Sequence, residues 1–326
     1  MLNDFCFIRS IKSLFKILFT SVLIIGEDQV KGEIKLVIII VAILLLIAFF
    51  ATSGPSRIKI KQKGSDTMLE IVQIWAEEYV KINDNVTISV SGGGSGTGIA
   101  QLINGQIDIA DASRPIKSHE IIQAKSQGVI PVEFRTCLDG IAIITNKNID
   151  ISEISFSQLR GIYNGTILNW DDIGGPSLKI TVYGRQSNSG TYVFLQEYVL
   201  DNNDYRTDMQ PLNGNAQIVD AVIGDNEGIG YVGVAYAENR ADELNILKVK
   251  KEDHMQAFLP TIENIASGDY PISRYLYIYI KGNPTGEIAR YIQWILDKDG
   301  GQKVAEELGF IPLPQNIIDE ELEKII

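Results

Sequence analysis

Four short polar segments of this chain hold the residues best suited to bind a ligand. Their members are Gly64-Ser65-Asp66-Thr67, the glycine-rich run 92–98, Ala112-Ser113-Arg114, and Arg185 with Ser189-Gly190-Thr191. Serine and threonine hydroxyls can donate hydrogen bonds, and arginine offers a charged fork suited to an oxyanion. Glycine lets the backbone N–H groups of a helix start approach a ligand closely. The segments together predict a donor-rich site for a small tetrahedral anion.

Each polar segment is expected to follow a strand and to precede a helix. Strand patterns occur at 57–61, 86–90, 106–110 and 180–183, and helix patterns at 68–80, from 99, at 118–127 and at 192–200. A further, apolar strand is expected at 140–145. Ser65 or Asp66 could cap the first of these helices. Repeated strand–turn–helix units predict an α/β protein, in which such turns meet at the carboxyl ends of the strands.

The same glycines do not complete a nucleotide-binding or hydrolase motif. Gly98 is followed by Ile99, where a phosphate loop needs lysine. Thr97 stands where a dinucleotide fingerprint or a nucleophile elbow needs glycine. The two histidines, His119 and His254, have no recognisable catalytic setting, and we interpret them as exposed or capping residues. We therefore expect neither catalysis nor a cofactor, and no metal site.

Composition and charge narrow the function further. The 326 residues include 41 Asp or Glu and 29 Lys or Arg, for a net charge of -12, which argues against a broad nucleic-acid surface. A few aimed dipoles can still hold one anion in an acidic protein. With only two cysteines and two histidines, the chain cannot build a zinc cluster of these residues. Cys137 is interpreted as a small buried hydrophobic residue.

The first 54 residues are expected to lie outside the folded part. The apolar run Leu36 to Phe50 follows Lys31 and Lys35, and small residues precede a cleavage position after Ser53. We expect either an export signal cleaved there or a membrane anchor over 34–52. Residues 1–30 fit a signal poorly, so we hypothesise that translation starts at Val30. Both alternatives place the protein in the periplasm or on the outer face of the cytoplasmic membrane.

Eight segments of the chain resemble, in order and spacing, those of the phosphate-binding proteins of phosphate-specific ABC transport systems. They are GSDTM at 64–68, SGGGSGTGI at 91–99, IADASRPIK at 109–117, LRGIYNGTILNWDDIGG at 159–175, GRQSNSGTY at 184–192, IGYVG at 229–233, YPISRYLYIY at 270–279 and GFIPL at 309–313. The resemblance implies a type II periplasmic-binding-protein clamshell with two mixed α/β lobes and a two-strand hinge. We expect lobe 1 to hold 55–142 and 275–326, and lobe 2 to hold 143–274.

The resemblance also implies the ligand-binding residues. The expected phosphate-binding set is Ser65, Thr67, Met68, Ser95, Ser113, Arg114, Arg185, Ser189, Gly190 and Thr191. In some members of the family, an aspartate in the third segment accepts the proton of hydrogen phosphate and so rejects sulfate. Ser113 stands at that position here, which leaves Asp66 and Asp111 as candidate acceptors. Arg114 is expected to add charge or to pair with one of these acids.

The expected function is that of a non-catalytic receptor, which delivers inorganic phosphate to a permease whose cytoplasmic ATPase drives uptake. We expect a monomer that binds no nucleic acid. The alternatives are a receptor for sulfate, molybdate or tungstate, a phosphomonoester hydrolase, and a membrane-tethered sensor.

Overall fold

The computed structural model describes residue 41 and residues 57–325. The predicted leader or anchor at 34–52, the cleavage after Ser53 and the start at Val30 fall outside these residues. Among the described residues, no helix is both long enough and apolar enough to cross a membrane. Residues Arg57–Ile326 form one compact unit, and the site lies within it.

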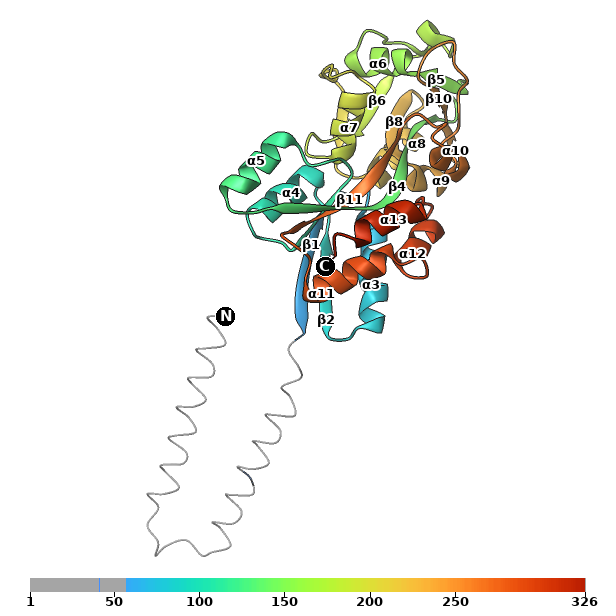
Figure 1. Cartoon of the computed structure of the whole chain (residues 1–326). Helices are drawn as coiled ribbons and strands as arrows, with labels where there is room; N and C mark the ends of the chain where they lie inside the picture. The colour runs from blue at the N-terminus through green and yellow to red at the C-terminus, as the bar shows by residue number, and fades with distance from the viewer. Residues whose placement is uncertain (1–40, 42–56, 326) are drawn as a thin grey trace, which may run out of the picture. The chain divides into compact units, whose positions relative to one another are not determined.

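The compact unit is a two-lobed α/β structure built around one long, curled path of strands (Figure 1). The path runs β2-β1-β3-β11-β4-β8-β6-β7, and β9 pairs with β4. The strands are β1 (Ile58–Gly64), β2 (Val86–Ser91), β3 (Ile109–Ala112), β4 (Pro131–Asn146), β5 (Glu153–Ser155), β6 (Thr181–Arg185), β7 (Gln210–Leu212), β8 (Gly228–Gly233), β9 (Leu244–Ile246), β10 (Lys248–Lys250) and β11 (Ser273–Lys281).

The helices lie on both faces of the strands. They are α3 (Leu69–Ile82), α4 (Ser95–Ile103), α5 (Ser118–Ser126), α6 (Phe156–Asn164), η1 (Trp170–Ile173), α7 (Gly190–Tyr198), α8 (Asn215–Gly224), α9 (Val234–Glu238), α10 (Ile262–Ser267), α11 (Gly286–Leu296), α12 (Gly301–Glu307) and α13 (Gln315–Leu322). The alternation of strand β11 shows how lobe 1 is packed. Leu276, Ile278 and Ile280 join the core under α3 and α11, whereas Tyr277 and Tyr279 face the core under α4.

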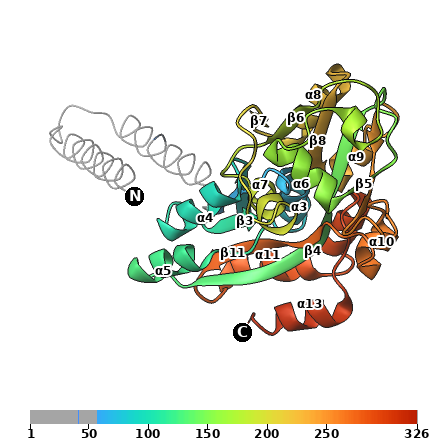
Figure 2. The same ribbon diagram turned by 90° about the horizontal axis from the view of Figure 1, so that it is seen from above.

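Two antiparallel strands, β4 and β11, connect the lobes (Figures 1 and 2). Residues 131–140 of β4 pair with β11 in lobe 1, and from Ile141 onward β4 pairs with β8 in lobe 2. The change of partner occurs beside the pair Ser273–Gly140. This is the two-strand hinge of the predicted clamshell, and the fold class is confirmed.

Most of the elements around the polar segments are as predicted, with three differences. Helix α4 begins at Ser95 instead of Ile99, so the glycine-rich run includes the first turn of the helix. The cap predicted at Ser65 or Asp66 is wrong, because Met68 is the N-cap of α3 and no side chain caps it. Strand β4 is much longer than the predicted 140–145, because it continues through the hinge. Cys137 is buried in the core of lobe 1, as expected.

Candidate functional site

The four polar segments meet between the lobes, as the sequence predicts. Those of lobe 1 follow the carboxyl ends of β1, β2 and β3, and the fourth follows β6 of lobe 2. They lead into the first turns of α3, α4, α5 and α7. Thr67, Ser95, Ser113, Arg185 and Thr191 are each at most 1% exposed, so the place where they gather is closed to bulk water. Helix N-termini that point into such a place favour an anion.

One cluster joins α4, the third segment and α7. The backbone N–H of Ser113 donates to Ser95 Oγ at 3.0 Å, and the two serine hydroxyls lie 3.2 Å apart. Gly190, the first residue of α7, faces both hydroxyls from lobe 2. A Cβ atom at Gly190 would overlap Ser95 Oγ and lie 2.6 Å from Ser113 Oγ. Only glycine therefore lets the N-terminus of α7 approach this serine pair.

A second cluster joins the lobes through two threonine hydroxyls. Thr67 Oγ1 and Thr191 Oγ1 lie 2.9 Å apart, and both side chains are fully buried. The Ser189 hydroxyl accepts a hydrogen bond from Thr191 N and caps α7, which leaves its own proton available for a ligand. The Met68 N–H donates to Ser65 O at 3.2 Å. The capping bond leaves Thr191 in the first turn of α7, with its hydroxyl directed at lobe 1.

Arg185 supplies the charge of the site. Its Nη2 donates to Asp66 Oδ2 at 2.6 Å across the cleft and to Asn213 O at 2.7 Å. The guanidinium is buried, and within the described part of the chain its Nε and Nη1 atoms have no hydrogen-bond partner. The buried Ser65 hydroxyl also has none there. Unsatisfied buried donors carry a high free-energy cost, so their presence indicates that an acceptor completes the site.

The two candidate proton acceptors lie in different surroundings. Asp66 touches Arg185, and its Oδ1 accepts the Gly93 N–H at 2.7 Å. Asp111 lies in the interior of lobe 1, where Gln62 donates to its Oδ1 at 2.7 Å. Burial raises the pKa of Asp111 to about 7, although the Gln62 hydrogen bond acts in the opposite direction. Asp66 is therefore the carboxylate at the anion-binding group itself.

One of our alternatives expected Arg114 to pair with Asp66 or Asp111, and this expectation is wrong. Its Nη1 and Nη2 donate to both oxygens of Glu120, at 2.8 and 2.7 Å. Burial raises the pKa of Glu120, but the hydrogen bonds from Arg114 and from Lys117 N outweigh it and leave the pKa below its ordinary value. The charge of Arg114 is thus balanced within lobe 1. His119 and His254 are exposed, as expected.

Sequence reasoning missed a buried ion pair beside the site. Arg274 Nη2 donates to Asp139 Oδ2 at 3.2 Å and to Thr191 Oγ1 at 2.8 Å. Burial raises the pKa of Asp139 and lowers that of Arg274, while the attraction between the two charges opposes both shifts. Asp139 comes just before the apolar run 141–144 and Arg274 just before the aromatic and aliphatic run 275–280, and a charge beside such a run is the signal that could have revealed them.

Asn188 was also missed, although it lies inside a quoted segment. Its backbone oxygen accepts the Gly96 N–H at 3.0 Å, and its Nδ2 donates to Gly93 O at 3.0 Å. Gly94 makes this approach feasible, since it has φ of 87° and its Cβ position lies 2.6 Å from Asn188 O. Tyr236 of lobe 2 likewise donates to Asp66 O at 3.1 Å. These contacts join the two lobes at the edge of the site.

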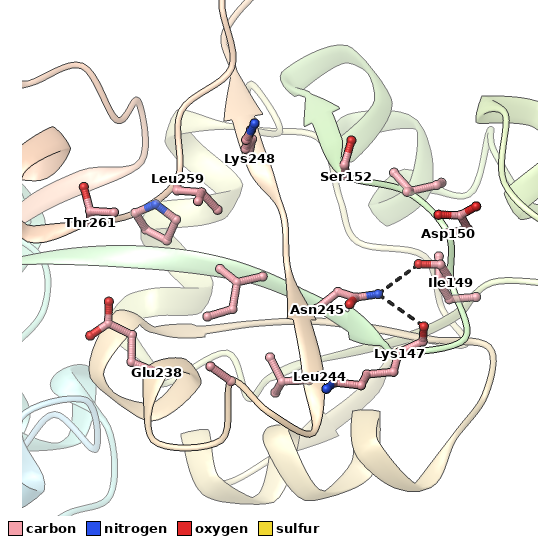
Figure 3. A pocket seen from close by; sticks show the side chains of 14 residues that line it. Lys147, Ile149, Asp150, Ser152, Glu238, Leu244, Asn245, Lys248, Leu259 and Thr261 are labelled. Atoms are coloured by element: carbon pink, nitrogen blue, oxygen red, sulfur yellow. Dashed lines mark hydrogen bonds between the residues drawn. The ribbon is translucent and has the colours of Figure 1, made fainter.

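A separate pocket of about 680 Å³ lies in lobe 2, where Lys147, Glu238 and Lys248 are among its lining residues (Figure 3). None of the residues of the four polar segments lines it. Among the described residues there is also no group of three or more His, Cys, Asp or Glu side chains placed to hold a metal ion. The buried donors between the lobes are thus the feature that defines the candidate site.

Comparison with known proteins agrees with this fold. Residues 51–299 match the family model described as the PBP superfamily domain. A phosphate-binding protein PstS from Staphylococcus haemolyticus is 34% identical over 272 residues, which cover 81% of this chain and 84% of that protein.

Two solved structures are similar over almost the same part of the chain. A Clostridium perfringens protein solved with bound phosphate is 28% identical with a TM-score of 0.69, and the match covers 78% of this chain and all of that one. An ABC-type phosphate transport receptor from Vibrio cholerae is 26% identical with a TM-score of 0.64, and this match also covers 78% of this chain and all of that one.

Fold and site together define a two-lobed substrate-binding protein with an anion site between the lobes. The chain belongs to the PBP superfamily and, within it, to the family of the PstS phosphate-binding proteins.

Proposed function

We propose that this protein binds inorganic phosphate between its lobes and delivers it to an ABC permease for uptake. The observation that carries the proposal is the set of buried donors on Arg185 and Ser65, which have no acceptor among the described residues. The hydroxyls of Thr67, Ser95, Ser113 and Thr191 surround the same region. An oxyanion with four oxygens can accept from a donor set of this size and charge.

The binding step is a closure of the lobes around the anion. Arg185 and the N-terminus of α7 approach from lobe 2, and Ser95 and Ser113 approach from lobe 1. Hinge motion of β4 and β11 brings these groups together. The closed lobes present a different outer surface from the open ones, which lets a permease distinguish loaded from empty receptor.

The remaining expectations belong to the same proposal. The lobes comprise 55–142 with 275–326 and 143–274, and the protein acts as a monomer outside the cytoplasmic membrane. It reaches that location through the segment at 34–52, whether this is cleaved or kept as an anchor. The protein is a receptor and not a hydrolase, since the family relatives named above are binding proteins.

Calorimetric titration of the ligand-stripped, full-length protein with phosphate and with sulfate, at pH 5 and 8, tests the proposal. We expect tight phosphate binding and much weaker sulfate binding. Arg185→Gln should weaken phosphate binding by at least about 30-fold, because it removes a buried charge from the site. Arg290→Gln, at an exposed arginine paired with Glu287, is the matched control and should bind as wild type does.

Three results would contradict the proposal. Equal affinity for sulfate and phosphate would define a general oxyanion receptor, and binding of neither anion would remove the site. Hydrolysis of a phosphomonoester by the wild-type protein that is abolished by Arg185→Gln would favour the hydrolase.

A further inference from the structure

Arg274 is placed where a strand of the hinge meets the anion site. It pairs directly with Asp139 across β11 and β4, next to the residue pair at which β4 leaves β11 for lobe 2. The side chains of Arg274 and Asp139 are 3% and 0% exposed. A charge pair buried this deeply stabilises a protein little by itself, so its position calls for another explanation.

The guanidinium is held against the first two turns of α7. Its Nη2 donates to Thr191 Oγ1, and the ring of Phe194, one turn further along α7, lies 5.3 Å from the guanidinium carbon. Asp139 fixes the same nitrogen from the other side. Arg274 therefore has one defined orientation relative to the Thr191 hydroxyl.

The donor chemistry of arginine then fixes the direction of the neighbouring hydroxyls. A guanidinium has donors and no acceptor, so Thr191 Oγ1 accepts from Arg274 and must direct its own proton elsewhere. The nearest acceptor is Thr67 Oγ1 at 2.9 Å, or a ligand oxygen in the same cleft. If Thr67 accepts that proton, its own hydroxyl proton in turn points toward the cleft. In either arrangement a proton is directed away from Arg274 and toward the bound anion.

We infer that Arg274 is a positioning residue, which uses the Thr191–Thr67 hydroxyl pair to present hydrogen-bond donors to the ligand and so selects ionised oxygens at this corner of the site. This inference rests on the proposed function, because it concerns the same anion site. It makes Arg274 act on the anion through Thr191, and Asp139 act by orienting Arg274. The protonated oxygen of hydrogen phosphate must then face another part of the site.

A double-mutant cycle between Arg274 and Thr191 tests this inference in the full-length protein. Arg274→Gln in the wild-type background should weaken phosphate binding about 10- to 100-fold, the range for a lost hydrogen bond to a charged group. In a Thr191→Val background, the same change should weaken binding by no more than about 3-fold. Arg274→Lys, which keeps the charge and the donors, should recover part of the lost affinity.

Controls separate this role from a general effect on folding. Arg274→Gln combined with Asp139→Asn keeps a neutral hydrogen-bonded pair, and should melt near the wild-type temperature while still binding weakly. Arg135→Gln is the matched control on strand β4, because Arg135 pairs with Glu320 and Glu321 and not with a residue of the site. It should leave phosphate affinity unchanged.

Each outcome distinguishes the inference from the proposed function. Equal losses from Arg274→Gln in the wild-type and Thr191→Val backgrounds would overturn the role of Arg274, while tight phosphate binding by the unmutated protein would uphold the proposed function. If the wild-type protein bound sulfate and not phosphate, the proposed ligand would be wrong, and the same cycle measured with sulfate would still decide the role of Arg274. Binding of neither anion would overturn both.

Discussion

At the scale of single residues, the site combines a positive charge with hydrogen-bond donors in a space closed to bulk water. Arg185 is a buried cation at the anion site, and Asp66 pairs with it from the opposite lobe. Removing Asp66 would leave the Arg185 guanidinium buried without its charge partner, which is energetically costly. The pair therefore helps to hold Arg185 in place. The two acids near the site, Asp66 and Asp111, are chemically alike but differ in what they touch, and this difference leads to separate predictions.

We predict that Asp66→Asn reduces the preference for phosphate over sulfate. A carboxylate can accept the proton of hydrogen phosphate but repels sulfate, whereas an amide can donate to either anion. The ratio of phosphate to sulfate affinity should fall by at least about 10-fold, as measured by calorimetry at pH 8. Asp111→Asn, the control, should leave this ratio unchanged. A loss of the same factor for both anions would mean that Asp66 acts only by holding Arg185.

A second residue-scale prediction concerns the stability of lobe 1. The pKa of Asp111 is raised from 3.8 to about 7 in the folded protein. Between these values the folded state holds a proton that the unfolded state has lost, so this carboxyl lowers stability as pH rises from about 4 to 7. The loss is complete above pH 7 and amounts to at most about 4 kcal/mol. Asp111→Asn should therefore raise the melting temperature at pH 8 more than at pH 5.

The measurement for this prediction is thermal unfolding of ligand-stripped protein at the two pH values. The exposed Asp84 offers a matched control, since Asp84→Asn should shift both melting temperatures equally. A difference between wild type and Asp111→Asn that is the same at pH 5 and 8 would show that the carboxyl is ionised throughout this range.

At the scale of elements, the site depends on how closely helix starts can approach one another. The N-termini of α4 and α7 come from opposite lobes and meet at Ser95 and Gly190. Their partial positive charges add at the same place, because both helices point their first turns at the cleft. The side chain at position 190 therefore decides whether the two helices can meet.

We expect Gly190→Ala to weaken phosphate binding by about 30-fold or more. The added methyl group overlaps Ser95 Oγ and lies 2.6 Å from Ser113 Oγ, so closure would require a shift of α7. Calorimetry gives the affinity, and circular dichroism checks that the fold is retained. Gly224→Ala is the control, since a Cβ there would have no neighbour within 4 Å. Unchanged binding by Gly190→Ala would show that α7 does not need this approach.

At the scale of the whole folded unit, the lobes are joined by contacts at the rim of the site as well as inside it. Asn188, Tyr236 and the ion pair of Lys117 with Glu197 all connect one lobe to the other. The ion pair is partly exposed and contributes little. The Asn188 contacts form only when the lobes are closed, so they affect release of the ligand more than its capture.

We predict that Asn188→Ala speeds phosphate release by about 3- to 10-fold, the effect of one lost hydrogen bond of its side-chain amide. The association rate should stay near the wild-type value, because the open form lacks this contact. Stopped-flow release into a fluorescent phosphate sensor measures the dissociation rate. Asn148→Ala removes an exposed hydrogen bond to Asn226 and serves as the control. A slower association rate with unchanged release would contradict this account.

The sequence alone determined the local features of this protein. Its alternating and helical patterns placed the strands and helices, and the glycine, serine and threonine content of the turns predicted an anion site, because these depend on neighbouring residues in the chain. Two element boundaries differ from the predicted ones, because tertiary contacts extend both elements. Helix α4 starts at Ser95, and strand β4 continues through the hinge. The polar segments and the family resemblance also pointed to Arg185, Ser95 and Thr191.

The contacts between these groups follow from the three-dimensional fold. Asp66 with Arg185, Thr67 with Thr191, and Asp139 with Arg274 are separated by 119, 124 and 135 residues. No local pattern encodes such pairings, since they arise when the curled sheet brings the ends of distant strands together. Arg114 differs from these three cases, because its partner Glu120 lies only six residues further along the chain. The sequence therefore predicts which residue types occur in each turn, whereas the long-range pairs between these residues depend on the fold.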